Sequence, residues 1–439
     1  MRELAERLVG WGRADGADEI EVSVVEGREF SVEVRRGRIE SLVEADSRVL
    51  GLRVTKDKRT AVASSSDLGP GTLRRLVRNA VRRAELAEPD PFAGLAPLTP
   101  STVDPDSLKL YDPEVPTLDP QKMIGLALET ERIALADKRI TNSYGAGFSS
   151  DDARVFLANS NGFSNGYSGT YCGLGVGLQA GATNARVEDS WSSSKRFFRD
   201  LASPEAVAKK AVERTVRQLR PRKIKTKNVP VVFEPTMTSW VLGFLFSCVA
   251  GTSVYQKASF LAEKLGARIG NPLVSVLDDG LLPGELGSRP FDSDGIPCRR
   301  TSVIDKGVLR AFLCNVYAAR KLGLETTGNA DGGGVGPHNF FLAPGGSRPE
   351  EIVASVREGL LLTRTLGHGL NPVTGDISRG AFGLWIEDGE IVHPVSEITI
   401  SGNLGRLLEG VEMVGNDLEF LGPVAGPTIK VAEMTVAGE

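Results

Sequence analysis

Asn371-Pro372-Val373-Thr374-Gly375-Asp376 opens the stretch that decides how this chain is interpreted, and Gly383-Leu384-Trp385-Ile386-Glu387-Asp388-Gly389-Glu390-Ile391 follows it. Apolar residues on both sides of Asp388-Gly389 predict two strands joined by a tight turn, because Asp-Gly accepts the positive φ that such turns need. Lys306-Gly307 separates two further short apolar runs in the same way. The last quarter of the chain is therefore expected to be rich in β-hairpins.

Composition places the chain among ordinary soluble globular proteins. Its 439 residues are 41% hydrophobic and 25% charged, which suits two or three domains, each with a full core. The net charge of -4 argues against direct nucleic-acid binding. Four cysteines form no CxxC pair, so a reducing cytoplasm with buried thiols is favoured: Cys172, Cys248, Cys298 and Cys314.

Nothing in the sequence predicts a membrane or secretory segment. The first seven residues form a charged amphipathic start that is unlike a signal peptide. The longest apolar run, 237–250, is interrupted by polar residues and glycine, and a bilayer-spanning helix needs about 20 apolar residues. We expect a cytoplasmic protein that does not contact membranes.

The N-terminal region, residues 1–88, is predicted to be a helix and antiparallel-sheet domain. Leu4, Leu8 and Trp11 share one helix face, and alternating apolar residues then mark strands that turns at Gly27, Gly37 and 56–58 separate. A second helix closes this α+β domain. Residues 89–118 follow as a proline-rich linker, since 8 of the 24 prolines lie between Pro89 and Pro120.

A glycine-rich middle domain is predicted for residues 119–220 and a β-rich α+β domain for residues 228–439. In the middle domain Asn161-Gly162 indicates a hairpin, and 167–182 is expected to be a long strand packed closely by another backbone. In the C-terminal domain the spacing of apolar residues predicts a helix over 349–361. The predicted fold class is α+β throughout.

Zinc-dependent hydrolysis is not supported by the histidines. A zincin needs two histidines one helical turn apart and a glutamate base. The histidines are His338, His368 and His393, which lie 30 and 25 residues apart, and none is followed by glutamate. A catalytic metal site would have to be assembled from distant residues.

Serine motifs are also present without their structural context. Gly162-Phe163-Ser164-Asn165-Gly166 matches G-x-S-x-G, but a nucleophile elbow needs a helix after the serine and here a strand is expected. Ser192-Ser193-Ser194-Lys195 matches S-x-x-K without its partner motifs. A hydrolase built on Ser164 remains an alternative.

From Val229 onward the order of features resembles the TldD/PmbA family. In its catalytic branch a strand leads into a helix carrying H-E-x-x-x-H, and a ligand cysteine follows the G-N-D-L segment. This chain has the strand at 229–234, but the helix region 235–245 holds no histidine, and 419–427 after Gly415-Asn416-Asp417-Leu418 holds no cysteine. Segment 252–261 resembles the one that replaces the continuation of the metal helix in the PmbA/TldE branch.

The resemblance implies a PmbA/TldE-type subunit that binds no cofactor itself. Such a subunit pairs with a zinc-bearing TldD-like partner, and the heterodimer encloses a chamber in which unfolded or leader peptides bind as extended strands. The family is also described as a modulator of DNA gyrase. Its activity is proteolysis, but we expect this chain to be inactive by itself because the ligands are missing.

Only regions can be nominated as functional. Two polar, glycine-bearing loops and one histidine are candidates for the peptide groove or the interface: Asn371, Thr374, Asp376, Asn416, Asp417 and His338. Turns that shape the core are the alternative for both loops. Two other functions stay open, a stand-alone metalloprotease with an atypical metal site and a homodimeric peptide-binding scaffold without proteolysis.

Overall fold

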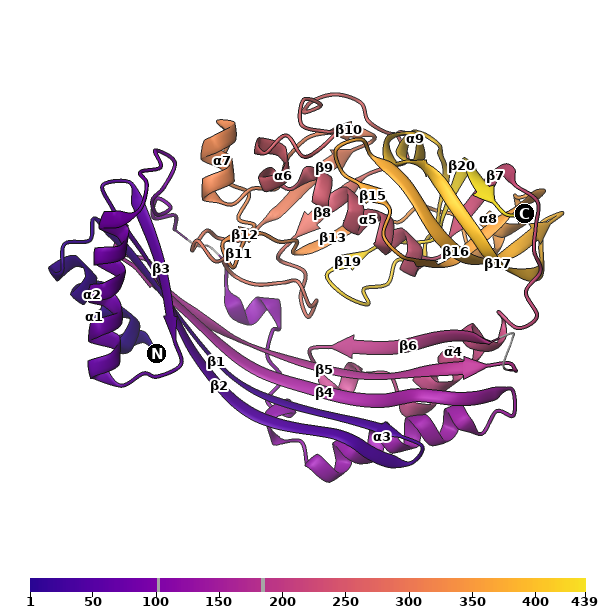
Figure 1. Ribbon diagram of the computed structural model, residues 1–439, viewed down its shortest axis with the longest axis horizontal. Helices are drawn as coiled ribbons and strands as arrows, with labels where there is room; N and C mark the ends of the chain where they lie inside the picture. The colour runs from indigo at the N-terminus through magenta and orange to yellow at the C-terminus, as the bar shows by residue number, and fades with distance from the viewer. Residues whose placement is uncertain (101–102, 183–185) are drawn as a thin grey trace.

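The computed structural model describes residues 1–100, 103–182 and 186–439. A six-stranded antiparallel sheet in the order β3-β2-β1-β4-β5-β6 dominates the first half. Its strands are β1 Glu19–Arg35, β2 Arg38–Lys56, β3 Arg59–Ser65, β4 Ile140–Asn159, β5 Ser164–Ala180 and β6 Val187–Lys195. The sheet is strongly curved, and its concave side faces the C-terminal half of the molecule (Figure 1).

Helices cover the convex side of this sheet in two pairs. They are α1 Arg2–Ala14 and α2 Pro70–Leu86 near one end, and α3 Pro120–Leu135 and α4 Pro204–Val216 near the other. Strand β1 serves both cores, because Ile20 and Val22 pack with the first pair and Phe30 and Val32 with the second. Since side chains alternate along a strand, the odd-numbered residues of β1 face the concave side.

Strand pairing joins the regions 1–88 and 119–220 in one sheet. Strand β1 pairs with β4 from Glu21 opposite Asn159 to Val34 opposite Ala146. The predicted turn at Gly27 is wrong, because Gly27 lies inside β1 and is paired on both sides, with β2 and with β4. The turns at Gly37 and 56–58 are confirmed, since each joins two neighbouring strands of the sheet.

The segment that follows α2 is bound to the C-terminal half. The Arg320 guanidinium donates hydrogen bonds to the carbonyl oxygens of Phe92, Gly94 and Leu95 over 2.7–3.0 Å. Two 3-10 turns, Pro105–Leu108 and Val115–Thr117, then lead into α3. Residues 89–100 and 103–118 thus contact both halves, since the Asp112 carboxylate of this segment accepts from the Phe198 amide of the first half.

The C-terminal half holds a closed sheet and an open sheet. Strands β14, β7, β20, β17 and β16 follow one another, and a pairing of β14 with β16 closes the ring; the open sheet has the order β10-β9-β8-β13-β19. The elements are β7 Lys227–Phe233, α5 Pro235–Val249, α6 Gly251–Tyr255, β8 Val276–Asp279, β9 Arg300–Asp305, β10 Val308–Leu309, α7 Val316–Leu322, β11 Ala330–Asp331, β12 Gly334–Val335, β13 Asn339–Leu342, α8 Pro349–Ala354, β14 Glu358–Leu366, β15 Leu370–Asn371, β16 Asp376–Glu387, β17 Glu390–Asn403, α9 Leu404–Glu409, β18 Val411–Val414, β19 Val424–Ala425 and β20 Ile429–Ala437.

The three hairpins predicted from X-Gly pairs are present, whereas one helix predicted from the spacing of apolar residues is too long. The hairpins at Asn161-Gly162, Lys306-Gly307 and Asp388-Gly389 are confirmed, and β5 is the predicted long strand. The helix over 349–361 is wrong beyond Ala354, because the chain continues into β14. Strand β14 is buried between parallel β7 and antiparallel β16, so it reads as a continuous apolar run rather than an alternating one.

The architecture is mixed α+β, as predicted. Its first half is an antiparallel sheet with helices on one face, and its second half combines parallel and antiparallel strand pairs. Among the described residues, no helix has the length and apolar character needed to cross a bilayer.

Candidate functional site in the concave groove

Three hollows follow one another along the concave face of the six-stranded sheet. They have volumes of about 530, 340 and 400 Å³. The first two share Val155, Tyr167 and Arg289, and the last two share Tyr171. They therefore form one continuous groove, which we call the concave groove. Grooves between two packed units of a protein frequently bind ligands.

The floor of the concave groove is made of small residues at its far end. Alternate positions of β5 and β6 carry glycine and serine, among them Gly173, Gly175, Ser192 and Ser194. The prediction that another backbone packs closely on this strand is wrong here, because the face remains an open hollow. The opposite face of β5 carries Leu174 and Val176, which are buried beneath α3 and α4. Alternation in one strand thus supplies both a core and a groove floor.

Charged residues gather in the first hollow, which we call the Glu21 pocket. Sheet strands β1 and β2 contribute Glu21 and Arg53, and the loop after Arg289 contributes Asp292 and Asp294. Arg53 bridges the two halves of the molecule, with Nη2 3.1 Å from Glu21 Oε1 and 2.9 Å from Asp294 Oδ1. This ion pair fixes the C-terminal loop over the sheet.

Burial and charge both act on the pKa values in the Glu21 pocket. Desolvation raises the pKa of Glu21 to about 7; Arg53 opposes this rise, whereas the nearby Asp294 and Asp292 add to it. Desolvation and Asp294 likewise raise the pKa of Asp292 to about 6, although three backbone N–H groups oppose the rise. Glu21 Oε2 has no hydrogen-bond partner.

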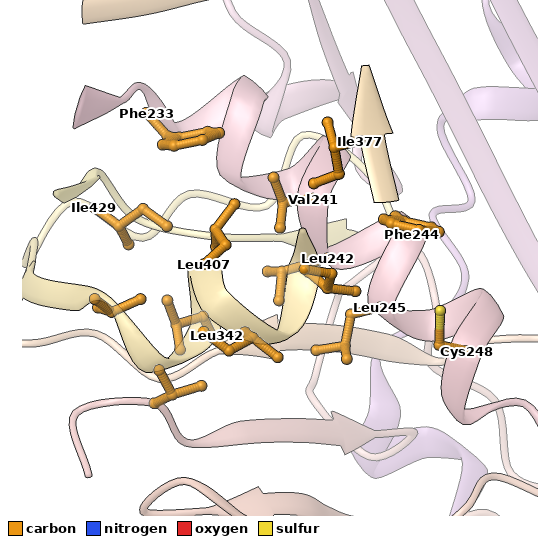
Figure 2. Packing of buried hydrophobic residues seen from close by; sticks show 14 of the residues in the cluster. Phe233, Val241, Leu242, Phe244, Leu245, Cys248, Leu342, Ile377, Leu407 and Ile429 are labelled. Atoms are coloured by element: carbon orange, nitrogen blue, oxygen red, sulfur yellow. The ribbon is translucent and has the colours of Figure 1, made fainter. Parts of the chain in front are cut away.

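Helix α5 lies in the core of the C-terminal half. The residues on one broad side of it are buried, including Val241, Leu242, Phe244 and Leu245 (Figure 2). The segment that follows β19 packs on its first turns so tightly that a Cβ added to Gly426 would lie 2.3 Å from Thr238 Cγ2. The apolar side of α5 therefore belongs to the core, whereas Thr236, Ser239, Gly243 and Ser247 lie on its other, half-buried side.

Just before α5, Glu234 lies in a buried ion-pair cluster. Arg214 Nη1 is 2.6 Å from Glu234 Oε1, and Arg217 Nη2 is 2.7 Å from Oε2. Both arginines belong to the end of α4, so this cluster connects the N-terminal half to the start of α5. Each oxygen of its carboxylate is paired with a guanidinium group, so the cluster links two parts of the fold.

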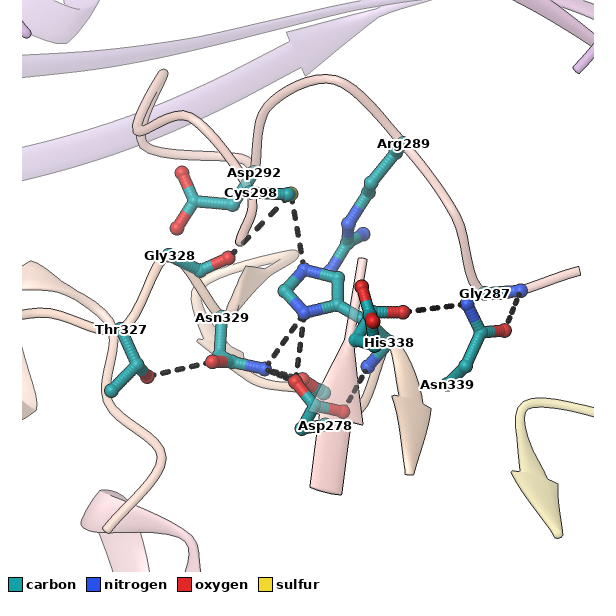
Figure 3. A network of polar contacts seen from close by, with 12 residues as sticks. Asp278, Gly287, Arg289, Asp292, Cys298, Thr327, Gly328, Asn329, His338 and Asn339 are labelled. Carbon is teal, nitrogen blue, oxygen red and sulfur yellow. Dashed lines mark hydrogen bonds and ion pairs between the residues drawn. The ribbon is translucent and has the colours of Figure 1, made fainter. Parts of the chain in front are cut away.

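A second polar network surrounds His338 in the interior (Figure 3). His338 Nδ1 lies 2.8 Å from Asp278 Oδ2, and Nε2 lies 3.1 Å from Cys298 Sγ. Because a carboxylate can only accept hydrogen bonds, Nδ1 carries the proton and donates a hydrogen bond to Asp278. Asn329 also donates to Asp278 Oδ2, over 2.7 Å.

The His338 network is closed to ligands. Burial alone would lower the pKa of His338, but hydrogen bonds with Asp278 and Cys298 outweigh it and raise that pKa to about 10. A Cys-His-carboxylate arrangement is the kind that activates a thiol. Here His338 is 0% and Cys298 2% exposed, and neither lines the concave groove. The network holds β8 to the loop that precedes β13.

Comparison with known proteins decides the family. The first, central and C-terminal domains of the PmbA/TldA metallopeptidases match residues 20–84, 113–219 and 226–438. Metalloprotease PmbA of Escherichia coli O157:H7 is 37% identical over 429 residues, which cover 98% of this chain and 93% of that protein. The chain belongs to the PmbA/TldD metallopeptidase family.

Other proteins are similar over nearly their whole length. A Metalloprotease PmbA homolog of Haemophilus influenzae is 33% identical, covering 97% of this chain and 93% of its own. A candidate modulator of a DNA gyrase from Thermotoga maritima superposes with a TM-score of 0.91 at 27% identity, covering 99% of both chains. TldE from Thermococcus kodakarensis shares the fold, with a TM-score of 0.90 at 22% identity over 99% of this chain and 100% of its own.

A metallopeptidase family implies a metal, and α5 of this PmbA-like chain does not fit one. The buried side chains of α5 offer one hydroxyl and one thiol, Thr238 and Cys248, and otherwise only carbon. These two are ten residues apart, about 15 Å along a helix, so they cannot share an ion. In the described part of the chain, no three His, Cys, Asp or Glu side chains are placed to hold a metal.

The predicted site residues fall in three separate places. Asn371, Thr374 and Asp376 lie in the exposed turn between β15 and β16, where Thr374 Oγ1 donates to Asp376 Oδ2 over 2.6 Å. Asn416 and Asp417 follow β18. The Asp417 carboxylate accepts from the Thr428 amide and hydroxyl over 2.9 and 2.7 Å. His338 is the buried histidine described above. Among the described residues, no hydrogen bond joins one of these places to another.

Sequence reasoning missed the residues of the concave groove. Glu21 occupies a polar position of an alternating strand, and such a position normally faces solvent. The partners of His338 are remote in sequence, since Asp278 is 60 residues away and Cys298 is 40. The glycines of β5 were the one visible signal, because a strand that carries glycine at alternate positions leaves one face open.

Proposed function

We propose that this chain is a non-catalytic, PmbA/TldE-type subunit of a zinc-dependent peptidase. It binds unfolded or leader peptides as extended strands in the concave groove, and it completes a chamber together with a zinc-bearing, TldD-like partner. Zinc and hydrolysis belong to the partner. Strand β6 forms one edge of the sheet and lines the groove, so a peptide lying there can pair through main-chain hydrogen bonds.

The packing of α5 is the observation that carries this proposal. The chain belongs to a metallopeptidase family, yet the helix where its resemblance places the metal ligands is filled with core side chains. A zinc site of the catalytic kind needs three nitrogen, sulfur or oxygen ligands and an open position. The concave groove is present in the same chain, which supports a role in binding peptides without hydrolysing them.

Metal analysis and assay of two preparations test the proposal. The chain alone is expected to contain less than a tenth of an equivalent of zinc and to leave an unfolded casein substrate intact. The same chain recovered with a TldD-like protein from its own cells is expected to be active and to lose activity with a chelator. Stoichiometric zinc together with peptidase activity in the chain alone would refute the proposed non-catalytic role and favour a stand-alone protease. Recovery of a homodimer without a protease partner would favour the scaffold.

A further inference from the structure

The Glu21 pocket carries more negative charge than its arginines compensate. Four acidic side chains line it, Glu21, Asp292, Asp294 and Asp331, against two arginines, Arg53 and Arg289, an excess of two negative charges when all are ionised. The exposed Asp331 lies 3.6 Å from Arg289. A pocket with this excess favours a cationic ligand.

Hydrogen bonds inside the protein satisfy the other buried acids but not Glu21. Both Asp292 oxygens accept backbone N–H groups, from Asp294 and Ile296 at Oδ1 and from Ala330 at Oδ2. Asp294 Oδ1 accepts from Arg53, and Oδ2 accepts from the Val316 amide. Glu21 lines the pocket and is 8% exposed, and its Oε2 is shielded from solvent and has no hydrogen-bond partner among the described residues. A buried carboxylate oxygen without a partner is costly, so a donor that reaches it gains more than it would in water.

The walls of the pocket suit an alkyl chain that ends in a cation. Leu157 and Phe291 belong to one buried apolar cluster, and the rings of Tyr167 and Phe291 meet edge to face with centroids 5.3 Å apart. The volume of about 530 Å³ exceeds that of a single side chain. Apolar walls, an aromatic pair and one unpaired carboxylate oxygen are the elements that recognise an ammonium group on a hydrocarbon stem.

We propose that the Glu21 pocket binds a primary ammonium group, with Glu21 as its counter-ion and the Leu157–Phe291 wall packed against its alkyl stem. In a peptide this group is either the N-terminal ammonium or a lysine side chain. The pocket would then select peptides by charge at one end of the concave groove. This specificity deepens the proposed peptide-binding function and rests on it only for the identity of the natural ligand.

Small probes test the pocket without assuming a peptide. Butylammonium is expected to bind the full-length chain at least tenfold more tightly than butanol at pH 8, because the two differ in the charge that meets Glu21. Glu21→Gln should abolish this preference, whereas Glu29→Gln, on the same face of β1 outside the groove, should keep it. Equal binding of the two probes to the wild-type chain, or an undiminished preference in Glu21→Gln, would overturn the proposal.

Acid provides a second readout that needs no variant. Protonated Glu21 offers no charge, so the preference of the wild-type chain should fall at least fivefold between pH 8 and pH 5. The other charged groups that face Glu21 are Arg53, Asp292 and Asp294, and the pKa of Asp292 is also raised into this range. A preference unchanged over this interval would contradict the assignment to Glu21 even if Glu21→Gln does not fold.

Three eight-residue peptides of otherwise equal sequence then separate the sources. One has a free N-terminus and no lysine, one is N-acetylated with a single lysine, and one is N-acetylated without lysine. Tighter binding of the first or the second identifies the natural ammonium group. Equal binding of all three refutes the ammonium pocket and leaves peptide binding standing. Binding of butylammonium but of no peptide supports the pocket and refutes the proposed peptide function.

Discussion

Replacing Glu21 by glutamine should change how stability depends on pH. The pKa of Glu21 is raised from its ordinary value of 4.5 to about 7 in the folded chain, chiefly because the carboxyl is buried. A raised pKa means that the folded state favours the protonated form. Its stabilising contribution is therefore complete below pH 4.5 and is lost as the pH rises through 7. At 1.36 kcal/mol per pKa unit, a rise of this size corresponds to about 3 kcal/mol.

The measurement is a comparison of two denaturant titrations across pH. The free energy of unfolding of the wild-type chain, minus that of Glu21→Gln, should fall by about 3 kcal/mol between pH 4 and pH 8. Contributions of all other titrating groups cancel in this difference, provided that the substitution leaves their environments intact. Circular dichroism can follow unfolding at each pH, with Glu29→Gln as the control. Curves for wild type and Glu21→Gln that stay parallel to within about 1 kcal/mol would refute the argument from burial.

Three further substitutions test the packing of the C-terminal half. His338→Ala should cost about 3–5 kcal/mol, because it removes the imidazole that pairs with the buried carboxylate of Asp278, and denaturant unfolding at pH 7 would measure it. Gly426→Val should cost about 1–3 kcal/mol or more through overpacking against α5. Its control is Gly422→Val, where an added Cβ meets no heavy atom within 4 Å, and this substitution should change stability by less than about 0.5 kcal/mol. Leu245→Ala should cost about 2–5 kcal/mol and Leu86→Ala, at a position 87% exposed, under about 0.5 kcal/mol; equal losses would contradict the assigned core.

Local turn chemistry explains which parts of the fold could be predicted from the sequence. Asn-Gly, Lys-Gly and Asp-Gly pairs supply the positive φ of a tight turn from within two residues, so no distant information is needed. The pairing of β1 with β4 joins residues more than 100 positions apart, and nothing local specifies it. Most of β2 before Leu50 is exposed, so this part of the strand carries no alternating apolar pattern.

The functional groups were harder to predict from the sequence than the fold. The sequence nominates His338 because it stands beside Asn339 near the glycine-rich loop, but its burial and its contacts with Asp278 and Cys298 depend on three separate segments of the C-terminal half. Glu21 was invisible because an outward position of a strand is polar by default. Residues 289–294 and 331–333, folded back over the sheet, convert that outward position into the wall of a pocket.

The polar clusters around His338 and around Glu21 differ in whether their hydrogen bonds are complete. Around His338, the carboxylate of Asp278 accepts from the imidazole, from Asn329 and from a backbone amide, and a saturated network of this kind specifies and rigidifies a core. Around Glu21, one oxygen lacks a partner although the side chain is buried in an excess of negative charge. An orphaned buried group calls for an explanation, and a ligand that completes it is one. The incomplete cluster also borders the groove and the complete one does not, so binding is expected at Glu21 and structural support at His338.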